Sequence, residues 1–118
     1  MITGLFENRD DIFDNFNVSD ELRKGIRIIY ADYSDEDYSG SAYVLFKKDG
    51  KYYDVAGSHC SCMGLENQWE PTETCEKTLL MRVEKGSYSN DKDEDKKIKN
   101  AILEALVDEI AERELLMS

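Results

Sequence analysis

The residues best suited to chemistry gather in one stretch, GSHCSCMGLENQWE, at positions 57–70. This stretch holds the only His of the chain, two of its three Cys and its only Trp. Imidazole and thiolate groups bind zinc, act as bases and nucleophiles, and take part in disulfide exchange. The stretch is therefore open to four interpretations: a metal site, a nucleophile, a redox pair, or a packed corner of the fold.

A zinc site is the first interpretation. Cys60 and Cys62 lie on the same side of an extended chain, and Cys75 would supply a third thiolate. His59 would be the fourth ligand, although as the neighbour of Cys60 it lies on the opposite side unless the chain turns there. Zinc modules usually contain C-x₂-C pairs, and this sequence has none. We therefore expect no cofactor, and we keep zinc as the alternative.

Cysteine chemistry finds less support. A catalytic thiol needs a base within hydrogen-bond reach and a third group that orients the base. Neighbours in sequence seldom meet this need, and His59 would have to pair with Cys75 across the fold. A disulfide between Cys60 and Cys62 would close a small, strained ring. We therefore expect no catalytic residue, and a cysteine-dependent enzyme acting through Cys60 or Cys62 stays an alternative.

An ordered corner is the favoured interpretation of the stretch. Free cysteine behaves as a small apolar side chain and is often buried. Gly57 and Gly64 permit the tight backbone that leads from a strand into a loop. Trp69 would then close over that loop before Pro71 starts the next element. The motif residues are His59, Cys60, Cys62, Gly64 and Trp69.

A β-hairpin is the element that would position this corner. The strands 41–48 and 51–57 flank Asp49-Gly50, a dipeptide that suits the positive φ angles of a type I′ turn. The turn determines the register of the facing pairs, which are Lys48–Lys51, Phe46–Tyr53 and Val44–Val55. One face of the hairpin then carries Val44, Phe46, Tyr53 and Val55, and the other carries Tyr43, Leu45 and Tyr52.

The chain before the hairpin predicts a helix, a helical turn and a strand. Ile12, Phe13 and Phe16 have helical spacing, so we expect a short helix over 10–16. Ser19 has the character of an N-cap that starts a single helical turn, which Gly25 stops. The segment IRIIYADY, residues 26–33, is rich in β-branched and aromatic residues and predicts a strand.

The chain after the corner predicts two helices. Thr72 or Thr74 would cap a helix that carries Leu79, Leu80 and Val83 and stops at Gly86, although alternation of Leu79, Met81 and Val83 also suits a strand. Residues 87–97 are expected to form a solvated loop. From about Asp95 the pattern is helical, with an apolar stripe of Ile98, Ala101, Ile102, Ala105, Leu106 and Ile110.

These elements predict an α+β fold in a single domain, residues 1–118. We expect a small antiparallel sheet around the Asp49-Gly50 hairpin, helices packed on one face, and a long C-terminal helix. A chain of 118 residues is long enough for one core and leaves little for a second.

Charge and composition limit the partners. The chain has 15 basic and 26 acidic residues, a net charge of −11, so phosphate backbones and anionic membranes repel it. We therefore expect no direct contact with nucleic acid or membrane, and a basic protein as partner. No segment is typical of a signal peptide or reaches the roughly 20 apolar residues of a membrane span. With an odd number of cysteines, this favours a soluble protein of the cytoplasm.

The densest acidic run lies in YADYSDEDYSG, residues 30–40. Tyrosines beside carboxylates are typical of a binding surface, because aromatic rings supply contact area. A solvated loop between strands is the alternative. The residues of this predicted acidic and aromatic surface are Tyr30, Asp32, Tyr33, Asp35, Glu36, Asp37 and Tyr38.

The segment from about Tyr38 to Pro71 resembles a family of small, mostly uncharacterised phage proteins. The resemblance rests on a strand with tyrosine and glycine, the D-G hairpin, and the string S-H-C-S-C-x-G-L-E-x-Q-W-E-P. It implies phage origin and the host cytoplasm, and it implies no activity. With the acidity, it suggests an accessory protein that binds and modulates a host protein in host takeover or anti-defence. Nucleic-acid mimicry toward a basic nucleic-acid-binding surface is one such mode.

Overall fold

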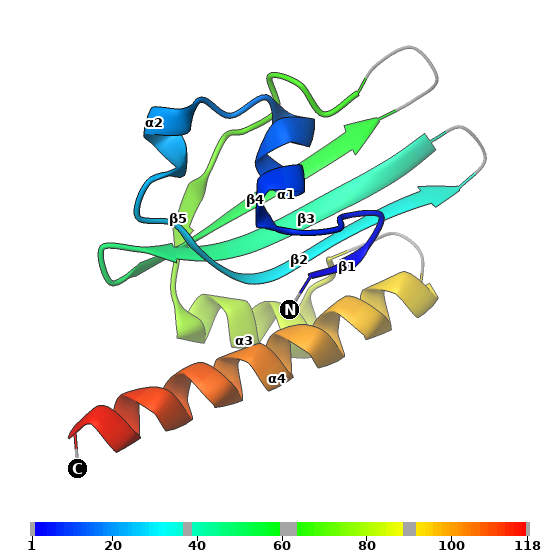
Figure 1. The fold of residues 1–118 in the computed structure, drawn as a ribbon. Helices are drawn as coiled ribbons and strands as arrows, with labels where there is room; N and C mark the ends of the chain where they lie inside the picture. Colours follow the sequence, from blue (N-terminus) through cyan, green and yellow to red (C-terminus); the bar gives the residue numbers. More distant parts are fainter. Residues whose placement is uncertain (1, 37–38, 60–63, 89–91, 118) are drawn as a thin grey trace. The chain divides into compact units, whose positions relative to one another are not determined.

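The computed structural model of the protein describes residues 2–36, 39–59, 64–88 and 92–117. The chain divides into two compact units, Met1–Thr74 and Cys75–Ser118. The N-terminal unit contains a five-stranded, mostly antiparallel sheet, and the C-terminal unit ends in a long helix (Figure 1). The α+β class expected from the sequence is confirmed.

The sheet of the N-terminal unit has the strand order β1-β2-β3-β4-β5. Its strands are β1 (Ile2–Gly4), β2 (Arg27–Glu36), β3 (Ser39–Lys48), β4 (Lys51–His59) and β5 (Thr72–Thr74). The short β1 runs parallel to β2, and the other neighbours are antiparallel. The sequence did not indicate β1 or β5, because three residues are too few to show an alternating pattern.

The predicted β-hairpin is present as β3 and β4. Asp49 and Gly50 have φ angles of 53° and 78°, the positive values that a type I′ turn requires. The predicted facing pairs, Lys48–Lys51, Phe46–Tyr53 and Val44–Val55, are all confirmed.

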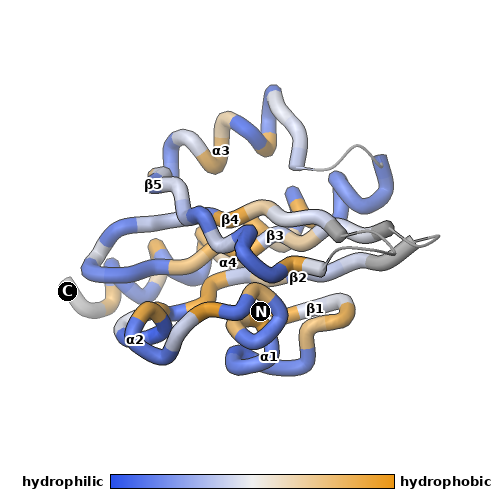
Figure 2. The backbone as a smooth tube through the Cα atoms, turned by 90° about the horizontal axis from the view of Figure 1, so that it is seen from above, coloured by the Kyte–Doolittle hydropathy of each residue, from blue (hydrophilic) through white to orange (hydrophobic). Residues whose placement is uncertain are grey.

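Helix α1 (Arg9–Phe16) covers one face of this sheet. The side-chain oxygen of Asn8 accepts a hydrogen bond from the Asp11 backbone N–H at 2.9 Å and caps the start of the helix. The predicted apolar residues of α1 are buried, and its hydrophilic positions, blue in Figure 2, lie away from the sheet. The core of this unit contains Phe6, Ile12, Phe13, Phe16, Ala31, Val44, Phe46, Val55 and Leu65.

The predicted helical turn follows as α2 (Asp20–Arg23), with Ser19 at its N-cap position. Gly25 has a φ angle of 77°, in the region that favours glycine, and the chain then enters β2. Leu22 of α2 and Ile26 of the α2–β2 connection line one pocket with Phe46 and Tyr53 of the hairpin.

The C-terminal unit consists of α3 (Glu76–Lys85) and α4 (Lys92–Met117). The helix expected over this segment is confirmed, but its N-cap is Cys75, because Thr72 and Thr74 belong to β5. Residues 92–97, expected to lie in a solvated loop, form the first turns of α4. Three acidic residues there suit the positive end of the helix dipole, and Lys99 pairs with Asp95 at 2.9 Å. Over the described residues, we find no helix that combines the length and the apolar character of a membrane span.

Candidate functional site

The first half of the predicted acidic surface lies inside the fold. Tyr30 and Asp32 are only 0% and 2% exposed, and they lie on β2, an inner strand with a neighbour on each side. Asp32 accepts a hydrogen bond from the Thr3 hydroxyl at 2.6 Å. Tyr33 is half-buried, with its ring centre 5.1 Å from that of Phe6. Tyr30 and Asp32 are thus buried, and Tyr33 packs partly on the core. This corrects the assignment of these three residues to an exposed surface.

The second half of the acidic run begins at the end of β2. Asp35 and Glu36 are the last residues of β2, across from Gly40 and Ser39. Asp37 and Tyr38 lie outside the described residues. Of the predicted acidic surface, the structure therefore describes Asp35 and Glu36 as backbone positions at this end of the sheet, and the surface itself stays a prediction.

The register brings the start of the His-Cys motif to this same end. His59 is the last residue of β4 and lies across from Gly40, which lies across from Asp35. Two strand spacings, about 10 Å, separate the backbones of His59 and Asp35. Cys60 and Cys62 lie outside the described residues. His59 and Asp35 are far apart in the sequence, so only the strand pairing shows that they lie at the same end of the sheet.

Thr74, the residue before Cys75, lies far from this end. Thr74 pairs with Tyr52, which is seven residues before His59 on β4, or about 23 Å along a strand. The Cys75 thiol is exposed and lies 3.3 Å from the Thr78 hydroxyl, and this hydrogen bond lowers the pKa of the thiol. The described residues contain no group of three or more His, Cys, Asp or Glu side chains suited to a metal ion.

The second half of the motif, from Gly64 to Trp69, is a packed corner held by Gln68. The Gln68 side-chain N–H group donates to the backbone oxygens of Ser58 and Gly64, each at 2.7 Å. The Gln68 side-chain oxygen accepts from the Ser58 N–H at 2.9 Å. The amide therefore pairs with β4 as the peptide group of a further strand would, beyond the end of β5.

Close packing favours Gly57 at this corner. A Cβ atom there would lie 3.0 Å from the Phe16 ring and 3.1 Å from the Leu65 side chain. Leu65 itself is 2% exposed. A larger residue would press on both side chains, because α1 and the corner both approach the backbone of β4 at this point.

The corner places Trp69 on the sheet. The Trp69 ring stacks on Phe46 at a centroid distance of 5.4 Å and an interplanar angle of 11°. Phe46 in turn stacks on Tyr53, also at 5.4 Å, with an angle of 18°. Phe13 and Phe16 of α1 meet the edge of Trp69 at 5.7 and 5.3 Å. Three stacked rings thus form a continuous aromatic floor.

An open groove of about 380 Å³ lies over this floor, and we call it the aromatic groove. Pockets of this size, with mostly apolar walls, are typical of sites that bind a small molecule or a partner side chain. The residues that line the aromatic groove are Leu22, Ile26, Phe46, Lys48, Asp49, Tyr53, Trp69 and Pro71.

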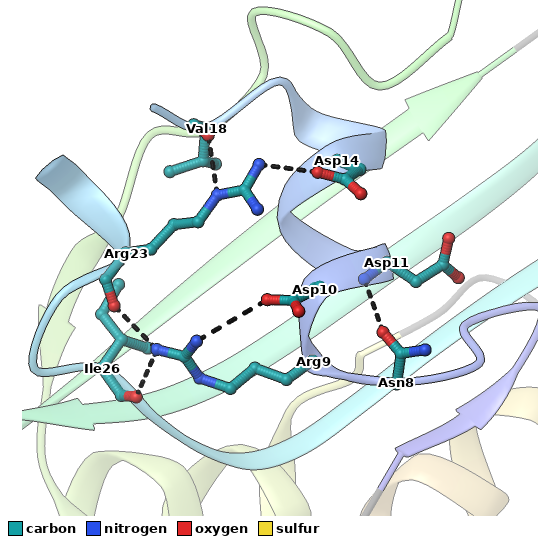
Figure 3. A network of polar contacts seen from close by, with 8 residues as sticks. All are labelled: Asn8, Arg9, Asp10, Asp11, Asp14, Val18, Arg23 and Ile26. Carbon is teal, nitrogen blue, oxygen red and sulfur yellow. Dashed lines mark hydrogen bonds and ion pairs between the residues drawn. The ribbon is translucent and has the colours of Figure 1, made fainter. Parts of the chain in front are cut away.

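Two arginines hold the wall of the groove that the α2–β2 connection forms (Figure 3). Arg9 donates to the backbone oxygens of Arg23 and Ile26, at 2.7 and 3.1 Å. Arg23 donates to the Val18 backbone oxygen at 2.9 Å and pairs with Asp14 at 2.7 Å. Both guanidinium groups also lie over the Phe13 ring, at 4.8 and 5.4 Å. The connection is therefore fixed to α1 before any ligand binds.

The aromatic groove offers mostly apolar contact area, and the described residues that line it include no His, Cys or Ser. Its floor and most of its walls are apolar, and its charged residues, Lys48 and Asp49, come from the hairpin turn. Such a surface binds an apolar or aromatic group. The sequence indicated the Phe46–Tyr53 pair, but it did not indicate the approach of Trp69 and Leu22 to that pair.

Comparison of the chain with protein-family models, with curated proteins and with solved structures finds no match.

Proposed function

We propose that the protein is a binding module that takes an apolar or aromatic side chain of a basic partner protein into the aromatic groove. The observation that carries this proposal is the preformed floor of three stacked rings in an open groove. Aromatic residues in fixed pockets dominate the binding energy of protein interfaces. A mostly apolar groove whose described lining includes no His, Cys or Ser favours binding over catalysis.

The charge of the chain supports a basic partner. A net charge of −11 attracts positively charged proteins and accelerates their encounter, whereas it repels nucleic acid. Following the resemblance to phage proteins, we propose a host protein with a basic nucleic-acid-binding surface as the partner. Binding would then modulate that protein during host takeover or anti-defence.

Peptide selection on the immobilised full chain tests the proposal. We expect the selected peptides to share one large apolar or aromatic residue flanked by Lys or Arg. Trp69 is the only tryptophan, so its emission should shift when such a peptide occupies the groove. A Leu22→Asp variant should bind these peptides at least about tenfold more weakly, because it places a carboxylate at the rim of an apolar groove.

Leu5→Asp is the matched control. Leu5 and Leu22 are both 54% exposed and both lie in the N-terminal unit, but Leu5 does not line the groove. Affinity should survive in Leu5→Asp. Peptides that bind both variants equally, or that leave the Trp69 emission unchanged, would overturn the groove as the binding site.

A second arm tests the contribution of charge. Replacing Asp35, Glu36 and Asp37 with Asn, Gln and Asn should slow association while the groove stays intact. Wild-type association should also slow as added salt shortens the Debye length below about 8 Å. If neither the triple variant nor added salt changes the association rate, charge steering is excluded. The proposal that the aromatic groove is the binding site would not be affected.

A further inference from the structure

The C-terminal unit exposes a second apolar surface, on α4. Its buried stripe includes Ile98, Ile102 and Leu106, which are at most 3% exposed. Leu103 and Val107 lie on a neighbouring side of the helix and are 38% and 63% exposed. Large apolar side chains that stay exposed at helical spacing are typical of a contact surface for another protein.

A row of carboxylates follows this apolar row along α4. Glu104, Asp108 and Glu112 are spaced four residues apart and exposed. Within the described part of the chain, these three side chains make no ion pair. Like charges at this spacing destabilise a helix. The row of carboxylates therefore lowers the stability of α4. This favours a role for the row in binding and not in folding.

The two rows enclose a shallow hollow. It has a volume of about 380 Å³ and is lined by Leu103, Glu104, Val107 and Asp108. Side chains four residues apart form ridges on a helix, and the groove between two ridges receives a ridge of a partner helix. We call the surface formed by Leu103, Glu104, Val107, Asp108 and Glu112 the α4 ridge.

We propose that the α4 ridge binds a basic amphipathic helix of a partner protein. The apolar side chains of that helix would pack between the two rows, and its flanking Lys or Arg residues would pair with the carboxylates. Helices recognise each other in this way when an apolar seam is bordered by complementary charges. Charge complementarity identifies this occupant, because the exposed border of the seam is acidic.

The same charges disfavour a second copy of this chain as the occupant. Two α4 ridges in contact would bring Glu104 and Asp108 of one copy close to the acidic row of the other, and such like-charge contact opposes association. Arg113, the one cation in segment 103–115, already makes a two-pronged contact with Glu76, at 3.2 Å for each nitrogen. It is therefore engaged within its own unit.

A leucine–lysine peptide about four helical turns long, with its leucines in one stripe, is the probe. Isotope-labelled full-length protein is titrated with it at low salt, and backbone NMR shifts locate the binding surface. We expect the shifts to concentrate on segment 103–112. A peptide of the same composition with scattered leucines should bind at least about fivefold more weakly, because it presents no apolar seam.

Variants assign the binding to the two rows. Val107→Ser, and separately the triple variant Glu104→Gln, Asp108→Asn and Glu112→Gln, should each lower the affinity at least about fivefold. The control for Val107 is Met81→Ser on α3, because Met81 is 53% exposed. The control for the triple variant removes three exposed carboxylates of the N-terminal unit, through Glu7→Gln, Asp20→Asn and Glu66→Gln. Circular dichroism verifies that each variant is folded.

The outcome is independent of the aromatic groove. Leu22→Asp, which blocks the groove, should leave peptide binding at the α4 ridge unchanged. Equal binding of both peptides, shifts outside segment 103–112, or equal losses in the test and control variants would each overturn the proposal. Concentration-dependent dimers that Val107→Ser abolishes would overturn it in favour of a second copy of the chain.

Discussion

The aromatic groove and the α4 ridge are both exposed and apolar, yet they are built differently. The rings of the groove come from β3, β4 and the corner at Trp69, segments that meet only through strand pairing and packing. The α4 ridge comes from one continuous helix. The groove carries one residue of each charge, Lys48 and Asp49, whereas the charged residues of the ridge are all acidic.

Because of this difference, substitutions in the two regions should affect stability and binding differently. Residues of the groove floor also pack on the core, so a change there alters the stability of the N-terminal unit as well as its binding surface. Residues of the α4 ridge project from a helix whose other side is buried, so a change there alters binding with little effect on stability. Three changes, ordered by expected effect, test this contrast.

Trp69→Ala should have the largest effect. It removes the ring that contacts Phe13, Phe16 and Phe46, and the loss of a large aromatic side chain from a packed site costs about 3 kcal/mol or more of unfolding free energy. Urea unfolding followed by circular dichroism measures it. Trp69→Phe retains a ring and should lose less than half as much. A loss below about 1 kcal/mol in Trp69→Ala would show that the floor is not part of the core.

Gln68→Ala should have an intermediate effect. It removes the side-chain hydrogen bonds to Ser58 and Gly64 that hold the corner, for an expected loss of about 1–2 kcal/mol. Gln68→Glu keeps only an acceptor and brings a carboxylate close to two backbone oxygens, so it should be no more stable than Gln68→Ala at neutral pH. Wild-type stability in both variants would contradict the role of Gln68 as a clamp.

Neutralising the acidic row of α4 should have the smallest effect, and one of opposite sign. The triple variant of Glu104, Asp108 and Glu112 removes two like-charge neighbours along the helix, so stability should rise by about 0.5 kcal/mol at low salt. Thermal unfolding at low and high salt measures the gain, which salt should diminish. A clear loss of stability would show that the three carboxylates make stabilising contacts within the protein. The ridge would then contribute to folding, as the groove floor does.

Local patterns of the sequence determined much of the fold. The Asp49-Gly50 turn and its register, helix α1, the turn at α2, the helix after Cys75 and the long C-terminal helix all follow from short-range signals. Backbone conformation and apolar spacing depend on neighbours along the chain, so such signals are readable without the fold. The single domain, the acidic host-binding role and the zinc alternative stay predictions.

Tertiary structure decided the rest, because strand pairing and packing join residues that no local pattern connects. Tyr30 and Asp32 are buried, and His59 lies two strands from Asp35. Thr72–Thr74 form β5, so the N-cap of α3 is Cys75. Tertiary structure also stacked Trp69 on Phe46, 23 positions earlier in the chain, and so formed the aromatic groove. The sequence alone showed which residues were scarce and which were acidic; only the sheet and its corner decided which of them share a surface.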